Sequence, residues 1–348
     1  MPSDPILLVG GAGTVGRHAA RQLRAAHPDL PLLLGSRDLA KAGEFADALG
    51  QAEAVALDLR GDDLGIGRRS VGAVAVLFTD RRLATLRFAQ ARGVPHLSIS
   101  PLLHEIGPEV GSYMHRPNAA PVVLGTEWLV GATTVPALDF AREFRRVDAI
   151  RIGALLDDLD VGGPAQRADL EHVTRTTPAA LARRDGAYVW RTGEDATANF
   201  RAVDGTDMAA TALSPNDVLG LALATGAPDV TFDLATGVSS SRRRGEPMST
   251  EIVIDLSGTD HAGQPLRTRH AIVHPAGQFP LTGLGVAMLL ERLVGLDGGD
   301  APPAGLYFPY QLLEPAAYLA RLRQIGGRVL ALDRRTRSGG SSKISESM

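Results

Sequence analysis

An apolar segment at residues 6–9 leads directly into a glycine-rich turn and then into a stretch with helical periodicity. The turn contains Gly11, Gly13 and Gly16 in the spacing G-x-G-x-x-G. The first glycine permits a tight strand-to-helix turn, the second leaves room for the phosphates of a dinucleotide, and the third lets the helix lie close to the strand. Unpaired amides and the positive dipole end at the start of the helix would bind the diphosphate.

The residues around the glycines support this interpretation. Val15, Ala19 and Leu23 recur at helical spacing after the turn, as expected when a strand feeds a helix. The alternative is a glycine-rich turn without a ligand, because 39 of the 348 residues are glycine. The place of the triplet between an apolar strand and a helix favours a nucleotide-binding motif.

The composition excludes several classes of protein. The formal net charge is −3, so no strong field attracts the chain to nucleic acid or a membrane surface. The absence of cysteine excludes disulfides, thiolate nucleophiles, iron–sulfur clusters and zinc–thiolate sites. No apolar run approaches the roughly 20 residues of a membrane span, and no leader precedes the first strand. We therefore expect a cytoplasmic protein that acts on a small molecule, with neither nucleic acid nor membrane as partner.

The first 130 residues alternate between strand-like and helix-like segments. Such repeats predict a doubly wound, Rossmann-type parallel sheet with right-handed crossovers. An almost wholly apolar strand at 71–78 is typical of a sheet covered by helices on both faces. The other expected strands are 30–34, 52–59, 94–100 and 121–125, and the expected helices are 38–49 and 81–92.

Beyond residue 130 strands follow one another with few helices between them. This order predicts a second, α+β domain with a mixed or antiparallel sheet. Strands are expected at 149–156, 188–192, 199–203, 230–235, 251–256 and 267–273. Helices are expected at 169–183, from Ser214 as the N-cap residue, at 284–293 and at 315–324.

A chain of this length is expected to form more than one domain. The expected units are a nucleotide-binding domain at 1–130, a substrate and dimerisation domain at 131–298, a C-terminal helical segment at 299–334 that could return to the first domain, and a disordered tail at 335–348 rich in Ser, Gly and Lys.

The residues at the end of the second expected strand indicate which nicotinamide cofactor binds. NAD-binding proteins usually place an acidic residue there, where it accepts from the ribose 2′-hydroxyl. This chain instead has Ser36 and Arg37, with Lys41 one helical turn later. A hydroxyl and a guanidinium suit a 2′-phosphate, so NADP (NADPH) is favoured. NAD remains possible, since Asp38 could reach the ribose.

The sequence resembles the saccharopine dehydrogenase-like oxidoreductases. The resemblance rests on residues 9–16 (VGGAGTVG), 35–37 (GSR), 92–100 (RGVPHLSIS) and 123–131 (VLGTEWLVG). It covers the first domain well and the second in outline. It implies a Rossmann domain followed by a mixed-sheet domain, use of NAD(P), and a homodimer. Members of this family oxidise or reduce secondary amines and imines, and others reduce carbonyl or alkene groups.

Two positions depart from the family pattern. Ser98 stands where the family usually has aspartate, and Glu127 and Trp128 occupy a segment where a proline–glycine pair is usual. Both positions flank the expected nicotinamide site, so the resemblance does not assign an amino-acid substrate. The expected cofactor contacts are Gly11, Gly13, Thr14, Val15, Gly16, Ser36, Arg37, Asp58, Leu59, Phe78, Thr79 and Ser98.

Hydride transfer to an imine or carbonyl needs a proton source near the receiving atom. Glu127, Tyr113 and His104 are the candidates, because they follow strands whose carboxyl ends face the cofactor cleft. His96 qualifies by position as well. Each has a structural alternative, namely helix capping, a surface loop or a hydrogen-bonded strand histidine. Aligned reactants also need little help from side chains, so a dedicated acid is not required.

These residues predict an NADPH-preferring oxidoreductase acting on a small imine, ketone or conjugated substrate. The alternative is a non-catalytic NADP-binding regulator that contacts a protein partner. The two differ in whether the cleft near Thr79, Ser98 and Glu127 is open, with convergent polar groups, or filled by side chains. A short-chain reductase is disfavoured, because no tyrosine is followed four residues later by lysine.

Three further clusters have less specific patterns. Residues 157–160 (DDLD) suggest a cation ligand but lack a partner at metal-ligand spacing, so no metal site is expected. Residues 239–244 (SSSRRR) could hold a substrate carboxylate or form a solvent-facing connection. His270 and His274 share one strand face without a third ligand.

Overall fold

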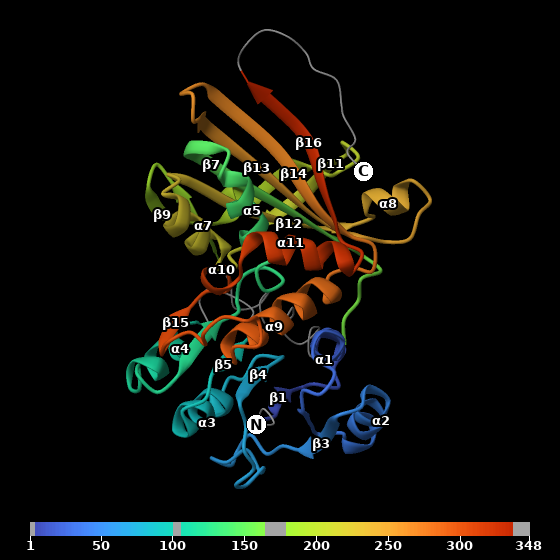
Figure 1. Ribbon diagram of the computed structural model, residues 1–348. Coiled ribbons are helices and arrows are strands. Elements are labelled where there is room, and N and C mark those ends of the chain that lie inside the picture. The colour runs from blue at the N-terminus through green and yellow to red at the C-terminus, as the bar shows by residue number, and fades with distance from the viewer. Residues whose placement is uncertain (1–3, 100–105, 164–178, 337–348) are drawn as a thin grey trace.

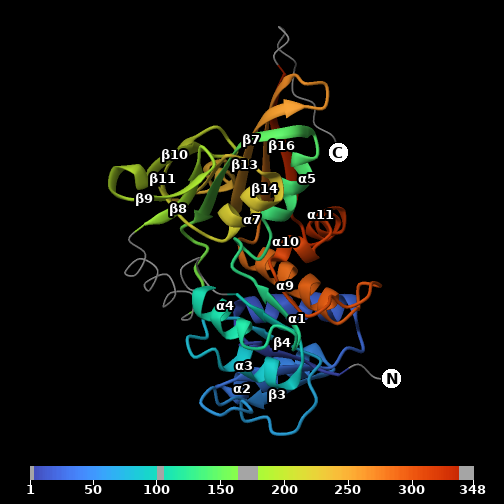
Figure 2. The same cartoon turned by 90° about the vertical axis from the view of Figure 1, so that its left-hand side faces the viewer.

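The structure is a computed structural model that describes residues 4–99, 106–163 and 179–336. Its two main sheets lie at opposite ends of the molecule, with helices α9 (Phe279–Leu293) and α10 (Pro309–Leu312) between them (Figures 1 and 2). One sheet is entirely parallel and the other is mixed. The predicted fold class, a Rossmann-type domain combined with an α+β domain, is confirmed.

The parallel sheet has the strand order β15-β6-β5-β4-β1-β2-β3. Strand β1 therefore lies between β2 and β4, where the order of the strands reverses, and ligands of such sheets bind at this point beyond the carboxyl ends. The strands are β1 (Ile6–Val9), β2 (Leu32–Ser36), β3 (Ala52–Ala56), β4 (Ala73–Val76), β5 (His96–Ser98), β6 (Pro121–Leu124) and β15 (Gly305–Tyr307).

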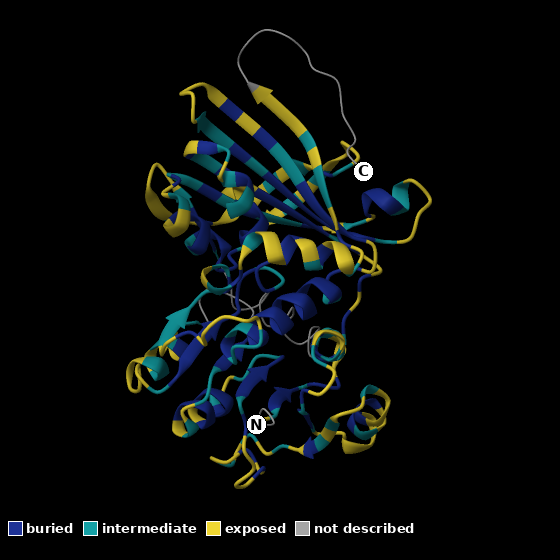
Figure 3. Ribbon diagram, viewed as in Figure 1, coloured by how far each residue is buried: buried dark blue, intermediate teal, exposed yellow. Residues whose placement is uncertain are grey.

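Helices cover both faces of this sheet, which explains its apolar strands. Ile6 and Leu8 of β1 belong to one core cluster, and Leu7 and Val9 belong to another on the opposite face. All four are buried, because side chains alternate along a strand and each face is covered. Figure 3 shows the central strands of this domain in the colour of buried residues. The helices of this domain are α1 (Thr14–Ala26), α2 (Leu39–Leu49), α3 (Ala84–Arg92) and α4 (Ile106–Met114).

The mixed sheet has the order β10-β11-β12-β7-β13-β14-β16, and the hairpin β8–β9 pairs with β12. Strands β12 and β7 are parallel, whereas their other neighbours are antiparallel. The strands are β7 (Phe144–Asp157), β8 (Ala180–Arg184), β9 (Ala187–Arg191), β10 (Thr197–Arg201), β11 (Asp207–Ala212), β12 (Asp229–Gly237), β13 (Thr250–Asp260), β14 (Pro265–His274) and β16 (Arg328–Thr336). The helices are α5 (Thr134–Ala141), α7 (Asp217–Thr225), α8 (Ser240–Arg243) and α11 (Pro315–Gln324).

Several expected helices differ from the structure. Helix α3 begins at Ala84 rather than at 81, and α9 begins at Phe279 rather than at 284. The helix expected at 169–183 is wrong at its end, because residues 180–184 form β8, which pairs with β9 through Leu181 and Trp190. Residues 164–178 lie outside the described part of the chain. The helix expected from Ser214 begins at Asp217, and Asn216 is its N-cap without a side-chain capping bond. Long-range contacts fix this start, since the Asn216 N–H donates to the carbonyl of Thr126.

The C-terminal part of the chain contributes to both sheets. Strand β15 extends the parallel sheet beside β6, and β16 extends the mixed sheet beside β14. The segment at 299–334, which was expected to be helical, therefore also contains strands. Strand β16 continues to Thr336, two residues into the tail expected at 335–348. Helix α9 packs against α1 so closely that a side chain at Gly283 would meet His18. This contact brings the two halves of the molecule together beside the glycine-rich turn.

Candidate functional site

The glycine-rich turn has the geometry that its spacing predicts. A side chain at Gly16 would lie 2.5 Å from the carbonyl oxygens of both Gly10 and Gly11, so only glycine fits where α1 crosses β1. Gly10 has φ = +88° and packs against Phe78. The turn is closed by the Gly13 N–H, which donates to the Gly10 carbonyl at 2.9 Å.

The first residues of α1 are open to solvent. Gly13 is the N-cap residue, and no side chain caps the helix. Gly13 and Thr14 are both exposed, whereas Gly11 and Gly16 are buried beneath them. The amides at this helix start point to the carboxyl edge of β1, where they can bind an anion. These residues therefore fit the diphosphate of a dinucleotide.

The end of β2 presents polar side chains to solvent. The Ser36 hydroxyl accepts a hydrogen bond from the Asp38 N–H at 3.1 Å, and Arg37 is exposed. The carboxylate of Asp38 caps α2 by accepting from the Lys41 N–H at 3.1 Å. This capping role ties one Asp38 oxygen to its own helix rather than to a ribose. Ser36, Arg37 and Lys41 remain as a hydroxyl and two cations at the same corner.

The remaining expected cofactor contacts lie at the ends of β3 and β4. Asp58 is exposed and accepts from the Arg60 N–H at 2.9 Å, and Leu59 is half-buried beside it. Phe78 contacts the glycine-rich turn through Gly10, which places its ring at the switch point between β1 and β4. Thr79 follows it, half-buried.

Ser98 is buried, and its side chain forms a hydrogen bond within the protein. Its hydroxyl donates to Oε2 of Glu109 in α4 at 2.9 Å, and both side chains are inaccessible. Its carbonyl accepts from the Gly125 N–H at 2.8 Å. Ser98 thus joins β5 to β6 and α4, and only movement of these elements would expose its hydroxyl to a cofactor.

Glu127 lies beyond the end of β6, beside hydrogen-bond donors from α5 and α10. Its side chain is buried and accepts hydrogen bonds from the Thr134 hydroxyl and the Tyr310 N–H. Asp217 at the start of α7 is also buried, and it accepts from the Trp128 N–H at 2.6 Å. The donors to this carboxyl pair are hydroxyl and backbone groups. One oxygen of each carboxyl makes no hydrogen bond to a described residue.

The two carboxyls affect each other's ionisation. Burial raises the pKa of Glu127 well above its usual value, and the nearby Asp217 raises it further, against the hydrogen bonds from Thr134 and Tyr310. Burial also raises the pKa of Asp217 to about 7, against the hydrogen bond from Trp128. Both shifts favour the protonated, uncharged form of the carboxyl group.

The loop that carries Glu127 is strained. Leu129, Val130 and Gly131 have φ values of 52°, 58° and 90°, so three consecutive residues are left-handed and two of them have side chains. Such backbone persists only where its surroundings hold it. Here α9 does so, because Gly285 lies directly against the carbonyl of Val130.

No contact between described residues brings the other acid–base candidates to Glu127. Tyr113 lies near the C-terminal end of α4, and its hydroxyl donates to the Pro117 carbonyl at 3.1 Å. His104 lies outside the described residues. His96 is buried beside the Thr85 hydroxyl, at 3.0 Å, and burial lowers its pKa to about 4 despite Asp80. His96 is therefore neutral and structural.

The three further clusters have structural partners. Arg242 pairs with Asp157 at 2.5 Å, and Arg243 and Arg244 pair with Asp204 and Glu246. Across the described ranges, no group of three His, Cys, Asp or Glu residues could hold a metal. His270 stacks on Phe140, and His274 bonds to the backbone carbonyl of Ile325.

Sequence reasoning missed the partners of Glu127. Asp217, Thr134 and Tyr310 come from three separate elements, and none belongs to a recognisable motif. The signal that was available is the acidic residue at position 217, but an acidic residue three positions after Ser214 is equally typical of a helix N-terminus.

No family model matches the chain, and no curated protein matches it. In the part of the chain that the structure describes, we find no helix with the length and apolar character needed to cross a membrane. The chain is similar to two solved structures at low TM-scores. These are dihydrodipicolinate reductase from Paenisporosarcina sp. TG-14 (TM-score 0.45, 12% identity, 89% of this chain and 100% of that one) and scyllo-inositol dehydrogenase from Lactobacillus casei (TM-score 0.46, 12% identity, 95% and 99%).

The structure is more similar to saccharopine dehydrogenase (L-Glu forming) from Saccharomyces cerevisiae. The TM-score is 0.66 at 14% identity, over 97% of this chain and 100% of that one. The resemblance drawn from the sequence is thus confirmed at the level of the fold: the chain has the fold of saccharopine dehydrogenase.

Proposed function

We propose that this chain is an NAD(P)-dependent oxidoreductase that prefers NADPH. The observation that carries the proposal is the exposed start of α1 above a glycine turn in which Gly16 has no room for a side chain. An uncapped helix N-terminus at the switch point of a parallel sheet is suited to a dinucleotide diphosphate. The fold shared with saccharopine dehydrogenase supports the same function.

The preference for NADPH rests on the end of β2. Ser36 and Arg37 replace the usual acidic residue, Lys41 adds a second cation, and Asp38 is engaged in capping α2. A Ser36→Asp variant should reverse the preference, because a carboxylate repels a 2′-phosphate and accepts from a 2′-hydroxyl. We expect its Kd for NADP+ to rise at least tenfold while its Kd for NAD+ falls, measured by calorimetry. Equal changes for both dinucleotides would contradict the assignment.

We propose a small imine, ketone or conjugated compound as the substrate. The nicotinamide cofactor supplies the hydride, and the chain binds and orients the reactants. Glu127 is the strongest proton-donor candidate, since burial raises its pKa and so favours the protonated form, and since it follows the carboxyl end of β6. Because its side chain is buried, movement of the strained loop at 129–131 must precede contact with a substrate. Tyr113 and His104 remain weaker candidates.

We further propose that the protein is a homodimer, as the resemblance to the family implies, and that it acts in the cytoplasm. Light scattering on the purified chain measures the oligomeric state directly. A monomer at micromolar concentration would argue against this part of the proposal.

The second candidate is an NADP-binding regulator without catalysis. Burial of Ser98 and Glu127 favours it, because neither side chain projects into an open cleft. One experiment separates the two functions: NADPH oxidation is followed with cyclic imines, keto acid and amine pairs, and enones. Turnover of any of these supports the oxidoreductase, whereas tight NADPH binding without turnover supports the regulator.

A further inference from the structure

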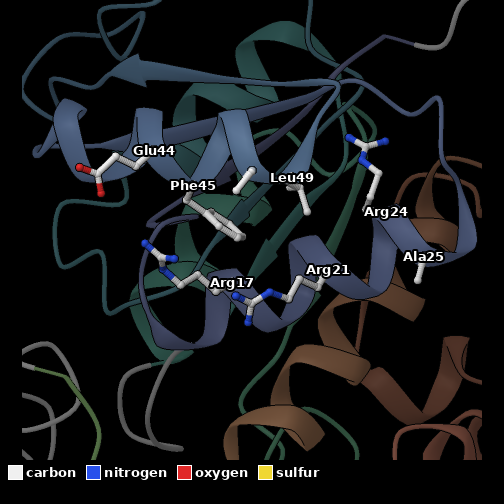
Figure 4. Close-up of a pocket in the computed structure, with 8 residues that line it drawn as sticks. Arg17, Arg21, Arg24, Ala25, Glu44, Phe45 and Leu49 are labelled. Carbon is white, nitrogen blue, oxygen red and sulfur yellow. The ribbon is translucent and has the colours of Figure 1, made fainter.

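A groove of about 550 Å³ runs between α1 and α2. Figure 4 shows Arg17 and Glu44 at one end of it and Ala25 and Leu49 at the other, so both helices begin at the same end. The positive ends of two helix dipoles therefore lie together at this end of the groove. The diphosphate and 2′-phosphate of the proposed cofactor approach the same two helix starts.

The three arginines of the groove differ in their partners. Arg24 donates to the carbonyls of His27, Pro28 and Gln51, so it is part of the scaffold. Arg17 donates only its Nε, to the Ala12 carbonyl at 3.0 Å, which leaves both terminal nitrogens available. Arg21 makes no hydrogen bond or ion pair to another described residue.

Phe45 of α2 keeps Arg17 and Arg21 side by side. Their guanidinium carbons lie 4.4 Å and 5.5 Å from the centre of its ring. Like charges four residues apart on a helix repel each other. Stacking on a ring holds a guanidinium in place without neutralising it. An anion between the helices would therefore be bound favourably.

Of the three arginines in the groove, Arg17 is the nearest to the expected adenosine ribose. Its Nε is fixed to Ala12 within the glycine-rich turn, and that turn is joined to β2 because the Gly10 N–H donates to the Gly35 carbonyl at 2.8 Å. The guanidinium thus lies between Ala12 of the turn and Phe45 of α2, and Lys41 is one helical turn before Phe45. Arg21 lies one helical turn further along α1.

We propose that Arg17 determines cofactor specificity by binding the 2′-phosphate of NADPH. Its two terminal nitrogens would donate to the phosphate while Nε stays on the Ala12 carbonyl, and Ser36, Arg37 and Lys41 would complete the site. This inference rests on the proposed preference for NADPH and adds a ligand from α1, an element outside the β2 end that suggested that preference.

The test measures Kd by calorimetry for NADP+, NAD+, 2′,5′-ADP and 5′-AMP on the full chain. Arg17→Gln should weaken binding of NADP+ and 2′,5′-ADP by about 10- to 100-fold, as expected for loss of charge-assisted hydrogen bonds. Binding of NAD+ and 5′-AMP should change less than about twofold, since neither molecule carries a phosphate on the ribose 2′-oxygen. Arg21→Gln is the matched control, because it removes the same charge from the same groove, and it should weaken NADP+ by less than about threefold.

The outcomes separate this inference from the proposed function. If the wild-type chain prefers NADP+ and the Arg17→Gln variant keeps the same preference, the role proposed for Arg17 is wrong. The proposed preference for NADPH would stand. Equal losses of NADP+ affinity in Arg17→Gln and Arg21→Gln would overturn the role of Arg17 too. They would indicate that the general positive charge of the groove, and not a direct contact from Arg17, attracts the phosphate. Wild-type chain that binds NAD+ as tightly as NADP+ would overturn both the cofactor preference and this inference. An unchanged melting temperature in Arg17→Gln shows that the variant is folded.

Discussion

The backbone N–H of Trp128 donates a 2.6 Å hydrogen bond to Oδ2 of Asp217, although the two residues are 89 positions apart. This bond ties the loop after β6 to the first residue of α7, and the Asn216 N–H reinforces it by donating to the Thr126 carbonyl. The same contact places Asp217 beside Glu127. A buried carboxyl pair therefore lies where the chain passes from the parallel sheet to the mixed sheet.

The first prediction concerns pH and Asp217. Its folded pKa of about 7 lies above the ordinary value of 3.8, so between these values the folded chain keeps a proton that the unfolded chain has lost. The free energy of unfolding should therefore decrease as pH rises from about 4 to 7, by at most about 1.4 kcal/mol per pH unit. Asp217→Asn should reduce this slope, because the amide does not titrate in this range while its oxygen still accepts from the Trp128 N–H. The slope that remains comes from other carboxyls with raised pKa, Glu127 among them. Urea unfolding at several pH values compares the two chains, and identical slopes would contradict the prediction.

The second prediction concerns Glu127 as a proton donor. Glu127→Gln keeps the shape of the side chain but removes its proton, so turnover should fall by about 100-fold, within the range typical of general acid catalysis. The Kd for NADPH should not change, because Glu127 is buried and lies outside the glycine turn. Single-turnover kinetics and calorimetry measure the two quantities. Full activity in this variant would show that the pair is purely structural.

The third prediction concerns Gly16. A methyl group there would meet two carbonyl oxygens at 2.5 Å, so Gly16→Ala should force α1 away from the turn. We expect a loss of about 1–3 kcal/mol in unfolding free energy, the usual cost of overpacking, together with weakened dinucleotide binding. Gly43→Ala is the control, because α2 has open space at that position. It should stabilise the chain by about 0.5–1 kcal/mol, and thermal unfolding checks both variants.

The fourth prediction concerns Arg242. Burial alone would raise the pKa of Asp157, but hydrogen bonds from Ser239, the Leu159 N–H and Arg242 outweigh it and lower the pKa to about 2. The stability from this carboxylate is therefore present above pH 4 and is lost as pH falls toward 2. Arg242→Gln should cost about 1–3 kcal/mol at pH 7, since it removes a charged hydrogen-bond donor from a buried acceptor.

The control for Arg242 is Arg244→Gln. That side chain pairs with Glu246 at the surface, where ion pairs contribute little, so its unfolding free energy should change by less than about 0.5 kcal/mol. If Arg242 held a substrate carboxylate instead, its variant would raise KM without loss of stability.

Much of the parallel domain could be predicted from local sequence. The apolar run of β4, the glycine spacing after β1 and the stop at Gly93 after α3 are each set by neighbouring residues, because backbone conformation and burial period act over a few positions. The helix at 315–324 was predicted to the residue, since Pro315 fits the first turn. Ser36 ends β2 and Arg37 follows it, two to three residues beyond the expected strand end at residue 34, so their placement was predictable to within a few positions.

The sequence alone determined the glycine turn, the order of the alternating elements and the basic end of β2, since each depends on contacts within one strand–helix unit. Only the tertiary structure decided that Glu127 meets Asp217, that α7 begins at Asp217, that residues 180–184 form a strand, and that Arg17 and Phe45 face each other across a groove. These features depend on which distant segments become neighbours. Local propensity carries no information about that choice, because the free energy that fixes it comes from packing between elements.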